Sequence, residues 1–342
     1  MKILIVASNM VHIKNFHAPY VNELRSMGHE VYVMANGDGA DFNIPFEKRA
    51  FSLKNMFLVS KIKKILKREN FDAVLLHTTL AAFWTRKAIK GLKNRPYVIN
   101  TVHGYLFNEN TSKLKRKIYL LCEKSVASVT DNILVMNKED MAIATKYDLS
   151  KGPVYEINGM GVNFDRIFTS EAKEKAPDEM INLLFIGEIS KRKNQEFLCK
   201  ALQKLPNYRL ILVGDGHERE RVEALARKIG VTDRLEITGF TNDISKYLKE
   251  ADIYVSASKI EGLPFNIMEA MYASLPIVAS NVKGNADLLS EKSLYPYNDA
   301  DEFVNKVKST PLGIVKYDME KYDIKTVLQE NIELYVSLIN NK

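Results

Sequence analysis

Two glutamates eight residues apart stand out in the segment KIEGLPFNIMEAM, residues 259–271. Proline fixes φ and lacks an N–H, so it suits the first turn of a helix, and we expect a helix that begins near Pro264. Glu261 then precedes the helix and Glu269 lies on it. Free N–H groups at a helix start favour an anion, whereas carboxylates favour hydroxyl groups. The spacing alone also fits a turn glutamate and a solvated helix glutamate.

A short basic run, KRK at residues 191–193, follows the apolar segment INLLFIG. Fixed cations after a strand stabilise an anionic group of a ligand. We therefore expect Lys193 to bind an anion and Arg192 to assist it. The competing interpretation is a solvated cluster of charge. No Asp-x-Asp motif is placed to hold a divalent ion beside them, so we expect neither a metal nor a separate cofactor.

Histidines follow three other apolar runs. His103 comes after PYVINTV and His77 after DAVLL, while His12 and His17 flank the loop after the first run. An imidazole in such a place is able to hydrogen-bond a substrate or carry a proton. Each could instead be a histidine of the core or of a turn.

These residues sit in a regular alternation of short apolar runs and amphipathic segments. Continuous Val, Ile and Leu runs between helical periods predict parallel sheets covered on both faces. The predicted strands are 2–8, 29–35, 72–78, 96–104, 132–137, 181–187, 208–216, 235–240, 252–258 and 276–280, and the predicted helices are 15–28, 60–70, 80–92, 113–130, 194–205, 217–229, 243–250 and 325–339.

The alternation breaks once, in the charged segment of residues 165–180, where we place a linker. The sequence therefore predicts an α/β protein with two doubly wound Rossmann-like domains facing across a cleft. The expected domains are residues 1–168 and 178–325, and residues 326–342 form a terminal helix that packs back on the first. Ligands of such sheets bind at the carboxyl ends of the strands, which is where the residues above stand.

The second half resembles the family four glycosyltransferases, which are retaining enzymes of the GT-B fold. The family signature E-x7-E stands here as EGLPFNIME, followed by AMYASLPIVAS and preceded by ADIYVSASKIEGLP. A further matching segment begins at LILVGDGHERERVEAL. The resemblance is strong over residues 180–290 and looser over the first half.

The resemblance implies a role for each glutamate and for the turn between them. Glu261 matches the residue beside the donor sugar, and Glu269 matches the residue that binds the ribose hydroxyls of the nucleotide. Gly262 and Leu263 match the turn whose N–H groups meet the donor.

It also implies that Gly187 and Lys193 belong to the diphosphate loop, although Glu188 stands where the family has an arginine. Asp287 likewise replaces a common glutamate. Such departures are typical of the branch that builds bacterial exopolysaccharides and capsules.

In the first half, the resemblance places His103 near the anomeric centre. It places His12 and His77 on the acceptor side. The family's glycines are missing from the loop SNMVHIKN, so we do not expect that loop to bind phosphate through its backbone.

Charge is unevenly distributed along the chain. Residues 1–170 hold 25 Lys and Arg against 15 Asp and Glu, although the whole chain carries a net charge of only +7. The basic stretches at 60–70 and 113–124 are either solvated helix faces or a surface that binds anionic lipid. Cys122 and Cys199 lack metal-ligand spacing, which indicates free thiols of a reducing compartment.

The first ten residues, MKILIVASNM, hold only a short apolar run, unlike a secretory signal. No window offers the roughly 18 apolar residues of a membrane span. We expect a cytoplasmic protein that binds the inner face of the plasma membrane peripherally.

The sequence thus predicts a retaining, metal-independent transferase that moves a hexose or N-acetylhexosamine from a UDP sugar to a lipid-linked glycan of capsule or exopolysaccharide synthesis. A nucleotide-sugar 2-epimerase shares the fold but should lack the EGLP-x4-E pattern of residues 261–269. A non-enzymatic two-domain sugar-binding protein would need an export signal. A nucleic-acid partner is not expected, because aromatics are not interleaved with the basic residues.

Overall fold

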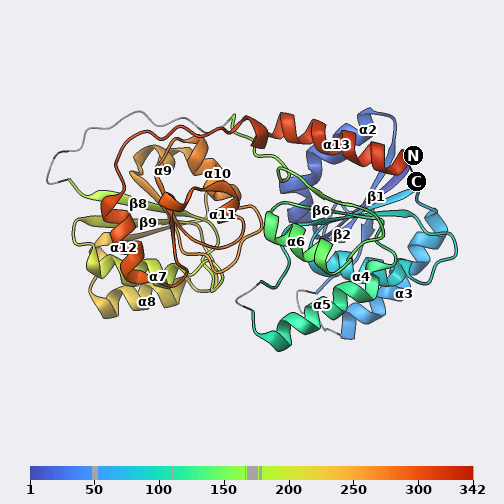
Figure 1. Cartoon of the computed structure of the whole chain (residues 1–342), viewed down its shortest axis with the longest axis horizontal. Helices are drawn as coiled ribbons and strands as arrows, with labels where there is room; N and C mark the ends of the chain where they lie inside the picture. Colours follow the sequence, from blue (N-terminus) through green and yellow to red (C-terminus); the bar gives the residue numbers. More distant parts are fainter. Residues whose placement is uncertain (48–52, 109–110, 166, 168–175, 177–178, 342) are drawn as a thin grey trace. The chain divides into compact units, whose positions relative to one another are not determined.

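The computed structural model divides the chain into two compact units. Unit 1 comprises Met1–Gly161 and Ile324–Lys342, and unit 2 comprises Val162–Asp323 (Figure 1). The structure describes all residues except 48–52, 109–110, 166, 168–175, 177–178 and 342. Each unit is an α/β domain, as the alternation of segments predicts.

Unit 1 is built on one parallel sheet with the strand order β3-β2-β1-β4-β5-β6-β7 in the described residues. Its strands are β1 Lys2–Asn9, β2 Glu30–Asn36, β3 Phe42–Asn43, β4 Ala73–Leu76, β5 Tyr97–Val102, β6 Asn132–Val135 and β7 Val154–Glu156. Its helices are α1 Met10–His12, the π-helix η1 Ile13–His17, α2 Ala18–Ser26, α3 Leu53–Glu69, α4 Thr79–Ile89, α5 Lys113–Ala127, α6 Lys138–Lys146 and α13 Ile324–Asn340.

The terminal helix α13 belongs to unit 1 and lies beside α2 (Figure 1). Asn331 on α13 donates from Nδ2 to the hydroxyl of Tyr20 at 2.9 Å and to the carbonyl of Gly159 at 3.0 Å. The Tyr20 hydroxyl in turn donates to the carbonyl of Met160 at 3.1 Å. Because Asn331 and Tyr20 are buried, these bonds fix the helix to the end of the first chain segment.

Unit 2 repeats the architecture with a parallel sheet of strand order β10-β9-β8-β11-β12-β13 in the described residues. Its strands are β8 Ile181–Ile186, β9 Tyr208–Val213, β10 Leu235–Gly239, β11 Ile253–Ser256, β12 Ile277–Ser280 and β13 Leu294–Tyr295. Its α-helices are α7 Gln195–Ala201, α8 Arg219–Ile229, α9 Ser245–Glu250, α10 Phe265–Tyr272, α11 Asn285–Leu288 and α12 Ala300–Ser309, and its 3₁₀ turns are η2 Leu202–Lys204, η3 Thr232–Arg234, η4 Glu291–Ser293 and η5 Glu320–Tyr322.

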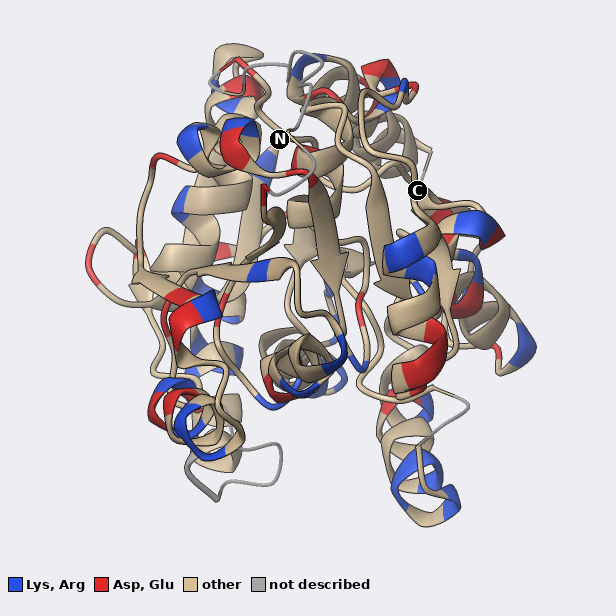
Figure 2. Ribbon diagram, turned by 90° about the vertical axis from the view of Figure 1, so that its left-hand side faces the viewer, with Lys and Arg blue, Asp and Glu red and all other residues tan. Residues whose placement is uncertain are grey.

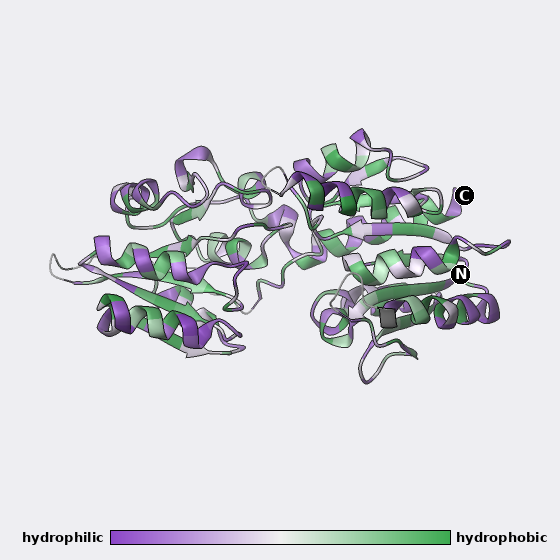
Figure 3. Cartoon of the chain, turned by 90° about the horizontal axis from the view of Figure 1, so that it is seen from below, coloured by the Kyte–Doolittle hydropathy of each residue, from purple (hydrophilic) through white to green (hydrophobic). Residues whose placement is uncertain are grey.

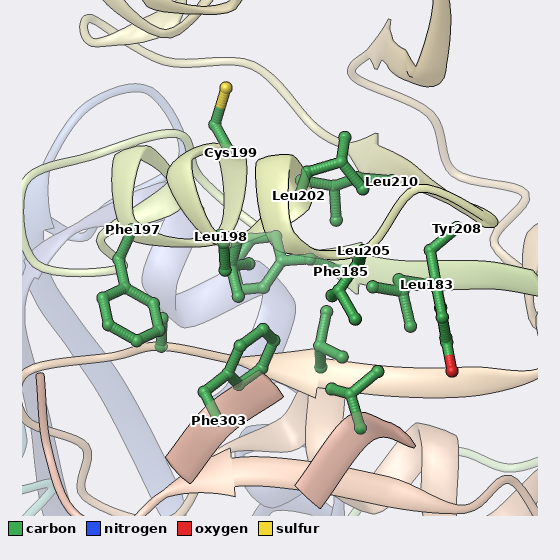
Figure 4. Close-up of a cluster of buried hydrophobic side chains, with 14 of the residues drawn as sticks. Leu183, Phe185, Phe197, Leu198, Cys199, Leu202, Leu205, Tyr208, Leu210 and Phe303 are labelled. Atoms are coloured by element: carbon green, nitrogen blue, oxygen red, sulfur yellow. The ribbon is translucent and has the colours of Figure 1, made fainter. Parts of the chain in front are cut away.

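The core of unit 2 lies between the sheet and the helices α7 and α12. Figure 4 shows Phe185 from β8, Leu198 from α7 and Phe303 from α12 packed together, and all three side chains are buried. Hydropathy follows the same division, because the strands are mostly hydrophobic and the outer helix faces hydrophilic (Figure 3). Burial of the strands on both faces explains their continuous apolar sequences.

The boundary between the units falls earlier than the sequence indicates, at Gly161 and Val162 instead of residues 168–178. The physical reason is that residues after Gly161 already pack on unit 2. The Val162 N–H donates to the carbonyl of Tyr322 at 2.8 Å, and the ring of Phe164 stacks on Tyr272 at 4.2 Å. Much of the predicted linker at 165–180 lies outside the described residues.

The sequence analysis also missed the short elements β3, β7, β13 and α11 and the longer helices α6 and α12. In addition, the helical path after β1 begins at Met10, not at residue 15, because the side chain of Asn9 accepts from the His12 N–H at 2.8 Å and caps the first turn. Among the described residues, no helix combines the length and the apolar character that crossing a bilayer requires.

Candidate active site

The loop after β8 and the loop after β11 meet at the switch point of the unit 2 sheet. Strands β9 and β10 are added to the sheet on one side of β8, and β11 is added on the other side. The strand order therefore reverses between β8 and β11, and the loops after these two neighbouring strands lead in opposite directions. Open α/β sheets bind ligands at such a point. The first loop carries Lys193 and the second carries Glu261.

Lys193 and Glu261 form a buried ion pair across this switch point. Nζ of Lys193 lies 2.7 Å from Oε1 of Glu261, and Nη1 of Arg192 lies 2.9 Å from Oε2 of the same carboxylate. The residues Lys193 and Glu261 are only 8% and 7% exposed. Two cations thus share one carboxylate, and the trio keeps a net positive charge.

The protonation of the pair follows from burial and from mutual attraction. Burial alone would raise the pKa of Glu261, but the charges of Lys193 and Arg192 outweigh it and hold that pKa below its usual value. Burial lowers the pKa of Lys193, and the carboxylate of Glu261 opposes this effect. The carboxylate is therefore ionised at neutral pH and helps to keep a buried ammonium charged.

Two glycines allow the loops to approach closely. Gly187 follows β8 with φ of +143°, a conformation that side chains rarely adopt. Gly284 has φ of +80°, and a Cβ there would lie 2.5 Å from the carbonyl oxygen of Gly262. The loop after β12 therefore presses directly on the turn that follows Glu261.

Helix α10 begins where the sequence predicts. Pro264 is its N-cap residue, and Phe265 is its first helical residue. Nδ2 of Asn266 donates to the carbonyl of Ile186 at 2.7 Å and ties the first turn to the end of β8. Glu269 lies one turn further along and is half-buried. The two glutamates are thus divided between loop and helix, as expected.

The remaining predicted residues of unit 2 lie in or beside these loops. Gly262 is half-buried and Leu263 is buried in the turn before α10. The carboxylate of Glu188, which replaces the expected arginine, is exposed and lies 4.0 Å from Nδ1 of His217. Asp287 accepts from the N–H of Gly284 at 3.0 Å, which makes it a capping residue of α11.

Sequence reasoning missed two buried polar residues near Glu261. Ser258 is fully buried, and its hydroxyl hydrogen-bonds Glu261. Lys283 is buried in the loop after β12, directly before Gly284. A basic residue between a predicted strand and a glycine was the available signal for Lys283, whereas Ser258 had none.

In unit 1, the predicted histidines come together. Nδ1 of His77 lies 3.2 Å from Nε2 of His103, and the ring centroid of His12 lies 5.2 Å from that of His103. All three follow strands β1, β4 and β5, so their common position is the carboxyl end of the sheet. Buried His17, which the sequence analysis named beside His12 without assigning it to the acceptor side, completes the cluster.

Two family models cover most of the chain. The model described as "Glycosyltransferase Family 4" matches residues 20–159, and the model described as "Glycosyl transferases group 1" matches residues 167–310. The chain belongs to the GT-B glycosyltransferases. The glycosyltransferase is similar to sucrose-phosphate synthase from Thermosynechococcus elongatus, with a TM-score of 0.79, 18% identity and 100% of both chains covered, which shows the shared fold.

Two curated relatives extend over nearly the whole glycosyltransferase. The putative glycosyltransferase EpsD of Bacillus subtilis is 29% identical over 330 residues, covering 90% of this chain and 86% of that protein. The UDP-Gal:alpha-D-GlcNAc-diphosphoundecaprenol alpha-1,3-galactosyltransferase of Escherichia coli is 27% identical over 329 residues, covering 88% of this chain and 84% of that protein.

Proposed function

We propose that this glycosyltransferase moves a hexose or N-acetylhexosamine from a UDP sugar to a lipid-linked glycan, with retention of the anomeric configuration and without a metal at the diphosphate. The observation that carries the proposal is the arrangement of Lys193, Arg192 and Glu261 at the switch point of unit 2. The name of the Escherichia coli relative supports the donor, the lipid diphosphate acceptor and the α-linkage.

The arrangement suits an anionic donor because its cations are only partly neutralised. Lys193 and Arg192 carry two positive charges against the single charge of Glu261. A diphosphate that enters the site binds both cations and releases the Glu261 carboxylate toward the sugar hydroxyls. The short helix α10, whose first turn is held by Asn266, presents its N-terminus beside them.

The bonds change on one face of the sugar in the proposed reaction. The bond between C1 and the β-phosphate oxygen breaks, and the acceptor oxygen bonds to C1 from the same side. The proton of the acceptor hydroxyl passes to the departing phosphate oxygen. Lys193 and Arg192 stabilise the charge of the leaving UDP, and we assign His103 a hydrogen bond to the sugar being transferred.

We assign the acceptor and the membrane surface to unit 1. On α5, Leu114, Ile118 and Leu121 share one face by their spacing, and all three are exposed. The same helix begins with four cations within five residues, Lys113, Lys115, Arg116 and Lys117, and Figure 2 shows blue gathered at that end. An apolar stripe beside cations favours an anionic bilayer.

A pocket next to this face suits the hydrocarbon part of the acceptor. It is small and open to solvent and is lined mainly by apolar side chains, among them Leu80, Phe83, Leu106, Phe107 and Tyr119. We assign it a contact with the first part of an isoprenoid chain, which is an apolar ligand.

The deciding experiment offers a panel of nucleotide sugars to the purified protein and measures donor hydrolysis without acceptor. We expect slow release of UDP and free sugar from one UDP sugar. Addition of a polyprenyl-diphosphate-linked acceptor should then yield an α-linked product, identified by NMR. Formation of a 2-epimer of the donor, without release of UDP, would instead identify an epimerase.

A further inference from the structure

Four histidines of unit 1 pack against one another at the carboxyl end of its sheet. His12 ends α1, His17 ends η1, and His77 and His103 directly follow β4 and β5. The ring centroids of His12 and His17 lie 5.0 Å apart, and the ring of His103 lies 5.2 Å and 5.7 Å from them. Such a concentration of imidazoles exceeds what hydrogen bonding to a sugar requires.

The backbone adopts an uncommon conformation to bring two of these rings together. The N–H of Ala18 donates to the carbonyl of Ile13, five residues back, which defines the π-helical turn η1. In an α-helix, residues five apart point about 140° away from each other. The wider π turn brings His12 and His17 toward the same face, and such turns occur mostly at functional sites.

One ring nitrogen from each of His12, His17 and His103 lies within 4.8 Å of the other two. A tetrahedral zinc ion holds ligand nitrogens at roughly 2.0–2.1 Å, and therefore roughly 3.3 Å apart, so a shift of about 1 Å per ring completes the geometry. Nε2 of His103 lies near Nδ1 of His77, which leaves Nδ1 of His103 for an ion.

Buried ring nitrogens of His12 and His17 lack hydrogen-bond partners among the described residues. His17 is fully buried, and within the described residues neither of its ring nitrogens has a hydrogen-bond partner. Nε2 of His12 is buried and unpartnered as well. Buried polar atoms are almost always bonded in folded proteins, so these atoms indicate a missing ligand.

We propose that His12, His17 and His103 bind one divalent transition-metal ion of the zinc class, with a fourth coordination position open to water. Three histidines and a water form a known tetrahedral zinc environment. Imidazole ligands without carboxylates favour Zn²⁺ over Mg²⁺ or Ca²⁺. The sequence analysis predicted no metal site, and the residues of this one all belong to unit 1.

Calorimetric titration of the chelator-stripped, full-length protein with Zn²⁺ tests the site. We expect one ion per chain, and with Co²⁺ the visible absorption of a tetrahedral complex. His12→Ala and His103→Ala should weaken Zn²⁺ binding at least about tenfold. His217→Ala, which removes an exposed histidine of unit 2, is the matched control and should bind as the wild type does.

His12 and His103 are partly exposed, so replacing them with alanine should leave the buried core intact. Circular dichroism of the variants checks that they fold. Absence of saturable Zn²⁺ binding would overturn the proposal, as would equal affinity in the wild type and in both variants. An octahedral Co²⁺ spectrum would also contradict the three-histidine geometry.

A consequence for transfer rests on the proposed function. His103 is assigned a hydrogen bond to the transferred sugar, and a bound ion would occupy its imidazole ring instead. Zn²⁺ should therefore inhibit transfer over the concentration range in which it binds. Each variant is compared with its own zinc-free rate. If Zn²⁺ binds without inhibiting transfer, the inhibition is refuted but the zinc site is not. If the protein shows no transferase activity, the proposed function fails, and the Zn²⁺ titration still decides whether the zinc site exists.

Discussion

The ammonium of Lys193 donates to the carboxylate of Glu261 at 2.7 Å, although the two residues are 68 positions apart in the chain. The pair connects the loop after β8 to the loop after β11 and is closed to solvent. Any anion that binds Lys193 therefore competes with, or releases, the side chain proposed to meet the donor sugar. The first three predictions follow from this coupling.

Lys193→Ala should weaken the binding of UDP by about 2 kcal/mol, roughly thirtyfold, because a charge-assisted contact is lost. Calorimetry with free UDP measures the change without any need for turnover. Lys191→Ala is the matched control, since that side chain is 70% exposed and should leave the affinity unchanged. Equal UDP affinity in the wild type and in Lys193→Ala would remove Lys193 from the site.

Glu261→Gln should act mainly on kcat, and Glu269→Gln mainly on the KM for the donor. Glu261 is proposed to touch the sugar, whose bonds change in the transition state, while Glu269 is proposed to bind the ribose, whose bonds do not. Steady-state kinetics at saturating acceptor separates the two effects. The reverse pattern would show that the roles of the two glutamates are exchanged.

Glu261 should also give the protein part of its stability above acidic pH. Its pKa is lower in the folded protein than the ordinary value of 4.5, so the unfolded chain binds the proton more readily. This stability is present above pH 4.5 and is lost as the pH falls through the lower folded value. Thermal melting below pH 4.5 should depend on pH less steeply in Glu261→Gln than in the wild type.

Exposed Glu188 supplies the control for that measurement, because its side chain is 58% exposed and its charge is only the last of the effects on the pKa of Lys193. Glu188→Gln should retain the wild-type pH dependence of melting. Identical curves for all three proteins would mean that the pKa of Glu261 is not lowered by folding.

Transfer should survive dialysis against EDTA, and added Mg²⁺ should not increase it. The physical reason is that Lys193 and Arg192 supply the charge that a divalent ion would otherwise bring to the diphosphate. Activity that disappears in EDTA and returns with Mg²⁺ or Mn²⁺ would rule out the metal-free reaction.

Leu114→Glu and Leu121→Glu should each abolish sedimentation of the protein with vesicles that contain anionic lipid. These side chains are 72% and 57% exposed, so the protein should fold normally with either change. Membrane binding should fail because it would bury the new carboxylate in the bilayer surface. Leu312→Glu, an exposed leucine of unit 2, is the control and should bind vesicles normally. Equal binding by all variants would exclude α5 as the docking face.

The sequence predicted best those features that depend on neighbouring residues. The alternation of apolar runs predicted both sheets, and the proline before NIMEAM placed Glu261 in a loop and Glu269 on a helix. Such features are encoded within one or two turns of the chain. The strands β3, β7 and β13 and the helix α11 were missed because two to four residues carry no periodicity, whereas the longer helices α6 and α12 were not recognised from their sequences.

Contacts between residues far apart in the chain could not be predicted from local sequence patterns. No residue near Lys193 indicates that its partner is Glu261, because the two meet only through the pairing of β8 with β11. The histidine cluster needed two further facts, the order of β1, β4 and β5 and the π turn at Ile13–His17. With ordinary helical periodicity, His12 and His17 would have been expected on different faces.

The return of α13 to unit 1 has a consequence for biosynthesis. Unit 2 is inserted between two pieces of unit 1, and its own ends are joined where Val162 pairs with Asp323. Chains emerge from the ribosome N-terminus first, so the inserted unit is complete before Asn331 exists to bond Tyr20. A chain stopped after Asp323 would therefore contain all of unit 2 and an unfinished unit 1.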